Sequence, residues 1–361
     1  MMDRASTVSN ITPMVDRVIL AEPRGFCAGV EMAIKALTWM LRIFAVPVYC
    51  YHEIVHNAWV VRAFEKAGVI FVNDISEVPT GSPVMLSAHG SAPQVVEDAR
   101  ERAAVVIDGV CPLVTKVHHE VKRMSQSGYD ILYIGHKRHD EAVGTVAVAP
   151  EAITMVSPES GVGDFAPKDP SRVALLAQTT LGMHEWSAVH DQAAEQFPEL
   201  WTARRSDLCY ATTNRQTVVQ SLAETCDLIL VVGSDNSSNT QALVRVADDL
   251  GTTAHRIDRA ADIFPEWLEG VSVVGVTAGA SAPEHLVQEV IEVLEPRNGF
   301  ELAHITDEEE YFPLPRQLRV FTSLLGQVVE AGLTVPASDW HAWTDFDRSW
   351  TASDALSLIN R

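Results

Sequence analysis

Cysteine is scarce in this chain of 361 residues, which contains five cysteines. This small, odd number argues against a disulfide scaffold, so a cysteine with a special role is expected to bind metal or act as a reactive thiol. Positive charge is also in short supply: 27 Lys and Arg face 48 Asp and Glu, which gives a formal charge of −21 and a pI near 4.9. Because a general nucleic-acid binder needs a basic face, we expect no nucleic-acid partner.

Long apolar runs are absent as well. No stretch approaches the roughly 20 apolar residues of a membrane helix. The first residues, MMDRASTVSNITP, lack the basic start and the apolar stretch of a signal peptide. We therefore expect a cytoplasmic protein with no membrane partner. The apolar content of 47% and charged content of 21% are globular values, and the length favours two or three domains.

Short runs rich in Val, Ile and Leu alternate along the chain with amphipathic stretches of helical length. The strand candidates are residues 17–23, 104–109, 129–136, 172–178, 226–234 and 271–279. Continuous apolar runs are typical of parallel strands that are covered on both faces. The pattern predicts an α/β fold with mainly parallel sheets, in which ligands bind at the carboxyl ends of the strands.

Three cysteine loops recur along the chain, each after a strand-like segment and before a helix: Cys27 in GFCAGVEMAI, Cys111 in DGVCPLVTKV and Cys209 in DLCYATTNRQ. A polar loop follows each cysteine after 28 or 29 residues, and a second follows after 62 to 72 residues. The first set of loops contains His56, His139 and Ser237, and the second contains His89, Thr179 and Ser281. Three such units of about 90 residues, arranged around one axis, would bring the three thiols together.

The repeat divides the chain into an N-terminal strand with the first cysteine loop (1–28), three α/β units (29–111, 112–205, 206–293), a closing segment (294–320) and a C-terminal extension (321–361). The extension carries Trp340, Trp343 and Trp350, and ends in TASDALSLINR, whose N-cap-like start predicts a short helix. We expect the extension to pack its tryptophans on the body. A partner-binding tail is the alternative.

Three cysteines from three units suit either zinc or an iron–sulfur cluster. Structural zinc sites use four ligands, often in paired C-x₂-C knuckles, and this sequence has no such knuckle. A [4Fe-4S] cluster tolerates widely separated cysteine ligands, and three of them would leave one iron open to substrate. The alternative is that cysteines are ordinary core residues, which we expect of Cys50 and Cys226 because both lie in apolar runs.

The polar loops supply hydrogen-bond donors of the kind that bind a diphosphate, together with backbone N–H groups at helix N-termini. The members are His56, His89, His139, Thr179, Ser237, Ser238, Asn239 and Ser281. Glu141 follows His139 by two residues, and we predict that it relays protons if it is enclosed near a metal cluster and an anion. Taken alone, such a histidine is more often structural and such a glutamate more often solvated. The sequence has no P-loop lysine motif, which argues against nucleotide hydrolysis.

Nine motifs in order resemble those of the LytB family, the 4-hydroxy-3-methylbut-2-enyl diphosphate reductases, from about residue 17 to 320. They are GFCAGVEMAI, EIVHN, SAHGSAP, CPLVTKVH, IGHKRHDEAVGT, AQTTLG, CYATTNRQ, VVGSDNSSN and TAGASAPE. The resemblance implies a cytoplasmic iron–sulfur enzyme of the last step of the non-mevalonate isoprenoid pathway. It also implies a trefoil of three pseudo-symmetric α/β units around one central [4Fe-4S] cluster.

The resemblance further implies roles for individual residues. Cys27, Cys111 and Cys209 would be the three cluster ligands, and Glu141 would be the proton donor. The diphosphate-binding set would be His56, His89, His139, Ser237, Ser238, Asn239 and Ser281. Thr179 would lie near the hydroxyl of the substrate, an allylic diphosphate, with Thr180 a weaker candidate. That hydroxyl would bind the open iron, and the products would be isopentenyl and dimethylallyl diphosphate.

Electrons would come singly from reduced ferredoxin or flavodoxin, as the resemblance implies. These donors are usually acidic, so a chain with a charge of −21 needs a local basic patch. The candidate patch is Lys116, Lys122, Arg123, Lys137 and Arg138. The alternative is that these are scattered, solvated charges.

The chain departs from the family pattern at three positions. Asp140 stands where proline is usual, Asp235 where lysine is common, and Gly182 where serine is usual. Asp140 would either raise the pKa of Glu141 by like-charge repulsion or point to solvent. The departures, with the tryptophan-bearing extension, suggest a divergent branch. Two other functions stay open: a redox-neutral hydratase or dehydratase, and a non-catalytic iron–sulfur sensor or structural metal protein.

Overall fold

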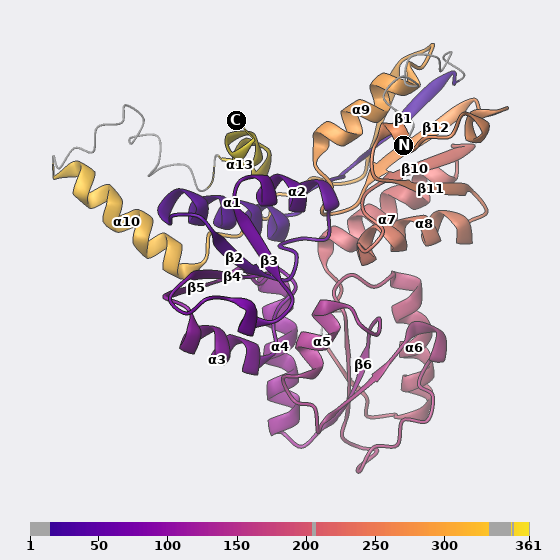
Figure 1. Cartoon of the computed structure of the whole chain (residues 1–361). Coiled ribbons are helices and arrows are strands. Elements are labelled where there is room, and N and C mark those ends of the chain that lie inside the picture. The colour runs from indigo at the N-terminus through magenta and orange to yellow at the C-terminus, as the bar shows by residue number, and fades with distance from the viewer. Residues whose placement is uncertain (1–14, 204–206, 332–347, 349, 361) are drawn as a thin grey trace.

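The computed structural model describes residues 15–203, 207–331, 348 and 350–360, and contains three parallel β-sheets that are covered by helices (Figure 1). Every strand pairing among the described residues is parallel. This confirms the predicted α/β class. The strands β8 (Val173–Ala177) and β10 (Leu228–Val232) are buried at all their residues, as continuous apolar runs require.

The first sheet has the order β3-β2-β4-β5. Its strands are β2 (Val48–Tyr51), β3 (Val69–Val72), β4 (Pro83–Leu86) and β5 (Val105–Asp108). The helices of this unit are α1 (Ala28–Ile43), α2 (Ala58–Lys66) and α3 (Pro93–Arg102).

The second sheet has the order β7-β6-β8-β9. Beside β8 it contains β6 (Asp130–Ile134), β7 (Ile153–Val156) and the short β9 (Trp201–Thr202). Its helices are α4 (Pro112–Gln126), α5 (Asp140–Val146) and α6 (Met183–Gln196).

The third sheet has the order β11-β10-β12-β1-β13, and it combines both ends of the repeat region. Beside β10 it contains β1 (Arg17–Glu22), β11 (Thr253–Ile257), β12 (Val273–Ala278) and β13 (Phe300–His304). Its helices are α7 (Tyr210–Ala223), α8 (Ser238–Asp249) and α9 (Glu284–Leu294).

The three sheets share one strand order over their first four positions. In the third sheet the fourth place is taken by β1, the first strand of the chain, which pairs with β12. The first and third strands of each unit are therefore neighbours, while the second and fourth lie outside them. This arrangement creates a topological switch point in every unit, where ligands bind in open α/β sheets.

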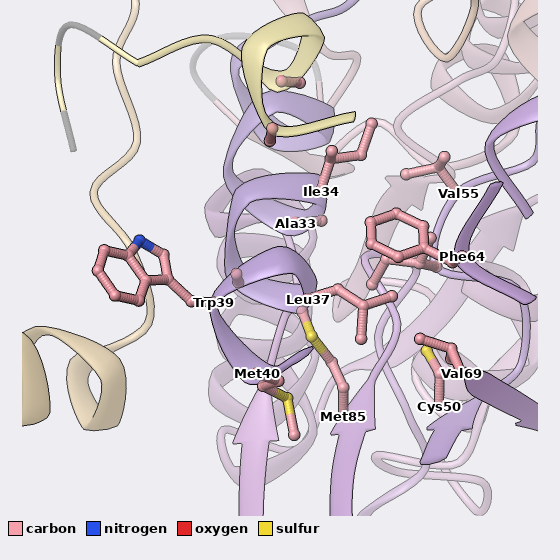
Figure 2. Close-up of a cluster of buried hydrophobic side chains, with 14 of the residues drawn as sticks. Ala33, Ile34, Leu37, Trp39, Met40, Cys50, Val55, Phe64, Val69 and Met85 are labelled. Carbon is pink, nitrogen blue, oxygen red and sulfur yellow. The ribbon is translucent and has the colours of Figure 1, made fainter. Parts of the chain in front are cut away.

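The C-terminal part contains α10 (Arg316–Glu330) and α13 (Ala352–Ile359). The predicted terminal helix is confirmed, since Thr351 caps α13 through the backbone N–H of Asp354. Buried Ala352, Ala355 and Leu356 pack α13 against α1, whose residues Ile34 and Leu37 point toward Phe64 (Figure 2).

The predicted packing of the extension is confirmed for Trp350, whose ring meets Trp39 edge-on at 6.4 Å. Trp340 and Trp343 lie outside the described residues. Cys50 and Cys226 are core residues, as expected, with 0% and 7% exposure. Within the described part of the chain, every helix is too short or too polar to cross a bilayer.

Candidate functional site

Each of the three predicted cysteines is the N-cap of a helix. Each helix follows the strand that is fourth in the order of its sheet: β1, β5 or β9. Cys27 begins α1, Cys111 begins α4 and Cys209 begins α7, all with extended backbones. None of the three thiols caps its own helix. Thiols at helix N-termini benefit from the positive end of the helix dipole, which favours the thiolate form.

Equivalent backbone hydrogen bonds fix the three cysteine loops. The N–H groups of Cys27, Cys111 and Cys209 donate to the carbonyl oxygens of Ala280, Ala88 and Thr179, at 3.2, 3.0 and 2.9 Å. Each acceptor lies in the loop after the third strand of a unit, where the second set of polar residues was predicted. The repeat therefore joins each thiol to a polar loop by the same contact.

One cavity, with an empty volume of about 720 Å³ including its open mouth, collects the predicted site. All the predicted ligands, donors and the acid line it: Cys27, His56, His89, Cys111, His139, Glu141, Thr179, Cys209, Ser237, Ser238, Asn239 and Ser281, together with Thr180. They come from loops of all three units, spread over 255 residues of sequence. The structure thus brings every predicted site residue together.

The structure adds lining residues that the sequence analysis missed, of which Gly29 is the most informative. A Cβ at Gly29 would lie 2.8 Å from the Cys111 Sγ, so the first turn of α1 leaves room for the cysteine that precedes α4. The signal in the sequence is a glycine two residues after Cys27, in a helical turn where it has no local benefit. The other missed residues are apolar or small: Val30, Val55, Ala88, Leu113, Val114, Ala211, Thr212 and Ala280.

The three thiols fit a positively charged metal group. Burial, followed by the charge of Cys27, raises the pKa of Cys209 to about 12, and burial with both other cysteines raises the pKa of Cys111. Three thiolates therefore cannot accumulate here without a compensating cation. This requirement matches a metal centre and not an ordinary core.

Spacing favours a multi-iron group over one zinc ion. Two thiolates on one tetrahedral zinc lie about 3.8 Å apart, given Zn–S bonds of about 2.3 Å. Among the described residues, the group with ligand atoms all within 4.8 Å of one another is His56, His89 and Asp140, and the cysteines do not form such a group. Sulfur atoms that are more widely spaced suit a cluster that spans several metal ions.

The histidines form a compact donor group at the other end of the cavity. The rings of His56 and His89 stack at 3.8 Å with planes 11° apart, and His139 meets His56 edge-on at 5.0 Å. An imidazole binds a metal in its own ring plane, so two parallel rings do not aim at one ion. Their Nε2 atoms are buried and have no partner within the described structure. Buried ring nitrogens of this kind suit an anion that accepts their N–H groups.

Burial disfavours the charged forms of His89 and His139. Burial and then the neighbouring His56 lower the pKa of His139 to about 3, and the same causes hold the pKa of His89 well below its usual value. The Nδ1 of His139 accepts the backbone N–H of Glu141 at 3.2 Å, which assigns the ring proton to Nε2. A neutral His139 can therefore still donate a hydrogen bond into the cavity.

Residues of the third unit complete the group of polar side chains that we call the donor ring: His56, His89, His139, Ser237, Ser238, Asn239 and Ser281. Ser281 donates its hydroxyl proton to the carbonyl of His56 at 2.8 Å, and Asn239 accepts the backbone N–H of Ala280 at 2.8 Å. Ser237 caps α8 by accepting the N–H of Thr240, and the Ser238 hydroxyl lies 3.4 Å from the amide nitrogen of Gln178.

Glu141 is the buried acid of the site. Its carboxylate oxygens accept the backbone N–H of Thr179 at 2.7 Å and the Thr179 hydroxyl at 3.1 Å. Burial raises the pKa of Glu141 to about 7, against the lowering effect of these hydrogen bonds and with a smaller contribution from Asp207. A carboxyl with this pKa is available both as acid and as base near neutral pH. Thr180 instead accepts a hydrogen bond from Gln178 at 2.8 Å.

Asp140 takes neither of its two expected positions, so both interpretations were wrong. Its carboxylate lies 2.9 Å from the His52 Nδ1 with a quarter of the side chain exposed, and it does not contribute to the raised pKa of Glu141. Asp235 is exposed beside Arg256. Gly182 is the N-cap of α6, where the Glu185 carboxylate accepts its N–H at 2.7 Å in place of a serine cap.

The five predicted patch cations come from two elements. Lys116, Lys122 and Arg123 lie on α4, whereas Lys137 and Arg138 lie in the loop after β6. Arg123 is paired with Glu120 at 2.5 Å and lies over the Trp201 ring. Arg138 lines a second cavity, which His56 and His139 also line.

Three parallel α/β units that meet at one cavity, lined by three cysteines and three histidines, define a trefoil α/β fold. A family model described as LytB protein matches residues 18–295. The chain belongs to the LytB family.

Relatives agree with this assignment. The chain is 47% identical over 319 residues to the 4-hydroxy-3-methylbut-2-enyl diphosphate reductase of Mycolicibacterium paratuberculosis, covering 87% of this chain and 96% of the relative. It is 48% identical over 307 residues to the enzyme of the same name from Streptomyces avermitilis, covering 84% and 90%. The solved E-1-hydroxy-2-methyl-but-2-enyl-4-diphosphate reductase of Plasmodium falciparum has a TM-score of 0.81 and 33% identity, covering 88% of this chain and 99% of that one.

Proposed function

We propose that this protein is an iron–sulfur oxidoreductase that converts (E)-4-hydroxy-3-methylbut-2-enyl diphosphate into isopentenyl and dimethylallyl diphosphate. This is the last step of the non-mevalonate isoprenoid pathway, and we place it in the cytoplasm. The observation that carries the proposal is the single cavity in which three thiols, a diphosphate-type donor ring and the buried Glu141 meet. The names of the relatives support the same reaction.

Cys27, Cys111 and Cys209 would hold one [4Fe-4S] cluster. The raised pKa values of Cys111 and Cys209 and the spacing of the three thiols support a cationic group larger than one ion. When bound, such a cluster with three protein ligands supplies electrons and an open Lewis-acid position for the substrate hydroxyl.

The chain's own residues would bind the diphosphate and move protons. His56, His89 and His139 donate to the phosphate oxygens from one side, and residues at the start of α8 donate from the other. The reductive dehydration breaks the allylic C–O bond, forms a C–H bond and releases water. It consumes two electrons from the reduced donor and two protons, one for the departing oxygen and one for carbon. Glu141 protonates the departing oxygen, and Thr179 holds the carboxyl in place through its two hydrogen bonds.

Demand for electrons tests this proposal against the redox-neutral alternative. The purified protein is incubated anaerobically with the diphosphate substrate, with and without dithionite, and products are identified by mass spectrometry. We expect C5 diphosphates that have lost the hydroxyl oxygen to form only in the sample that contains dithionite. Conversion without reductant would establish a hydratase or dehydratase, and no conversion in either case would leave the sensor interpretation.

Reduced ferredoxin or flavodoxin would deliver the electrons. The cations of α4 and of the loop after β6 would receive such an acidic partner: Lys116, Lys122, Arg123, Lys137 and Arg138. Charge complementarity of this kind mainly accelerates encounter.

A further inference from the structure

The pair His52 and Asp140 joins the first and second units beside His56 and His139 of the donor ring. The His52 Nδ1 lies 2.9 Å from the Asp140 Oδ1, and each side chain is about three-quarters buried. His52 follows β2 with a φ of 58°, and its ring stacks on Tyr51 at 4.1 Å. Asp140 is the first residue of α5, directly between His139 and Glu141.

A second cavity, with an empty volume of about 620 Å³ including its open mouth, lies at this pair, and we call it the vestibule. It shares His56 and His139 with the main cavity, so these two residues line both spaces. Its lining is His52, Glu53, His56, Asn73, Arg138, His139, Asp140 and Asn236. An anion that reaches the ring from this side passes the Asp140 carboxylate.

The position of Asp140 is electrostatically costly for an anion site. One of its oxygens lies within 4.8 Å of ring nitrogens of His56 and His89, the groups with unpartnered Nε2 atoms. A bare carboxylate at this distance repels a diphosphate and competes for the same imidazole donors. The second carboxylate of the vestibule, Glu53, is already engaged by Asn236 at 2.7 Å and by His56 at 3.3 Å.

We propose that His52 is the counter-ion that neutralises Asp140, so that the pair sets how tightly the donor ring binds a diphosphate. The identity of that diphosphate rests on the proposed function, whereas the charge compensation concerns any diphosphate in the ring. Neither residue reaches the reacting atoms, so both are positioning residues.

The charges around the pair favour its ionised form. The hydrogen bond to Asp140 raises the pKa of His52 against the lowering effect of burial, with a smaller contribution from Glu53. Burial opposes ionisation of Asp140, but the hydrogen bond and the charge of His52 outweigh it and lower the pKa of Asp140. The titratable and charged groups facing the pair from neighbouring elements are Tyr51, Glu53, His56, Asp74, His89, Arg138 and His139.

Substitutions at the two positions have opposite expected effects, which separates charge compensation from simple structural support. Binding of inorganic diphosphate to the cluster-loaded protein is measured by titration calorimetry at low ionic strength, with a chelator present. His52→Gln exposes the carboxylate, so we expect Kd to rise about tenfold. Asp140→Asn frees the cation, so we expect Kd to stay equal or fall. The double variant His52→Gln/Asp140→Asn is neutral, so its Kd should return to within about twofold of the wild-type value.

pH provides a second readout. The wild-type protein should lose affinity as pH rises through the raised pKa of His52, because the neutral imidazole no longer compensates Asp140. The Asp140→Asn protein should not lose affinity for diphosphate in this way. The Kd values of the two proteins are compared at each pH, so that the protonation of diphosphate itself affects both equally.

Control variants keep the test decisive. Asp140→Pro removes the carboxylate and preserves the backbone, since His139 is extended (φ −76°, ψ 134°) and proline is favoured at the first helical position; it should behave as Asp140→Asn does. Glu301→Gln breaks the exposed Arg17–Glu301 pair in the third sheet and should leave Kd unchanged.

Two results would overturn the inference: an unchanged Kd in a folded His52→Gln protein, or losses in the same direction for both single variants. The proposed function is tested separately, because diphosphate binding is measured without turnover. A protein that shows the predicted pattern of Kd values but does not convert the hydroxylated C5 diphosphate would retain this inference and lose the proposed reaction.

Discussion

Glu141 and Thr179 are joined by two hydrogen bonds across the switch point of the second sheet, at 2.7 Å to the backbone N–H and 3.1 Å to the hydroxyl. Glu141 lies at the start of α5 after β6, and Thr179 follows β8, the neighbouring strand. Thr179 also accepts the N–H of Cys209 at its carbonyl. One residue therefore positions both the acid and a cysteine loop.

Replacing the acid should remove turnover and leave the fold intact. In Glu141→Gln the amide can keep the hydrogen bond from the Thr179 N–H but cannot deliver a proton, so we expect kcat to fall by about 10²–10⁴-fold. Steady-state kinetics with reduced methyl viologen measure this. Glu151→Gln, at an exposed position, is the matched control and should retain full kcat. A Glu141→Gln protein with near wild-type turnover would contradict the assignment.

The buried carboxyls should make the cluster-free protein less stable as pH rises. Burial raises the pKa values of Glu141 and Asp207 to about 7, above their usual values of 4.5 and 3.8. A raised pKa in the folded state means that the stabilising neutral form is complete at low pH and is lost as pH rises through 7. The free energy of unfolding of the wild type relative to Glu141→Gln should therefore decrease from about pH 4.5 to 7.5. Denaturant titrations at several pH values measure the trend, and an increase would be inconsistent with burial as its cause.

Substitution of a cavity cysteine should abolish iron binding, whereas substitution of a core cysteine should not. Cys27→Ser, Cys111→Ser and Cys209→Ser each remove one of three thiols on one cavity, so we expect iron content to fall at least about tenfold. Cys226→Ala is the matched control, since Cys226 lies in a separate core cluster. Iron and sulfide contents are measured after anaerobic reconstitution. Equal loss of iron in all four variants would rule out the three cavity cysteines as the metal ligands.

The terminal helix should contribute measurably to stability. Leu356 is 2% exposed and packs in the core cluster of α1, so Leu356→Ala should cost about 2–5 kcal/mol in free energy of unfolding. Leu358, two residues later on α13, is 39% exposed, and Leu358→Ala should cost much less. Urea unfolding followed by tryptophan fluorescence measures both. Equal costs would mean that α13 does not stay on α1 in solution.

Charge reversal should distinguish a donor-docking surface from scattered charge. Lys122→Glu with Lys137→Glu leaves Arg138 in the vestibule unchanged. We expect turnover with reduced ferredoxin or flavodoxin to fall about tenfold at low ionic strength, and turnover with dithionite and viologen to stay the same. Equal losses with both kinds of donor would eliminate the docking assignment.

Local features of the chain were predictable from the sequence. The buried β8 and β10 lie within continuous apolar runs, and Cys27, Cys111 and Cys209 begin helices where turn residues end such runs. The repeated loops also predicted which residues meet in the cavity, because the strand order of each unit places its loops at one switch point.

Contacts between distant segments were beyond the sequence pattern. The place of β1 beside β12 depends on pairing across more than 250 residues. The room that Gly29 gives Cys111 and the pairing of Asp140 with His52 likewise depend on how segments far apart in the sequence pack. The sequence around a residue carries no periodic signal for its contacts with another unit. For this reason, the pairing of Asp140 with His52 was not predicted.

The most direct test of the account is an anaerobic assay of viologen oxidation. The cluster-loaded protein is mixed with reduced methyl viologen and a limiting amount of (E)-4-hydroxy-3-methylbut-2-enyl diphosphate. We predict oxidation that requires the substrate, stops at two electrons per substrate molecule, and is lost in Cys111→Ser. A protein with full iron and sulfide content that oxidises no viologen in response to this substrate would contradict it.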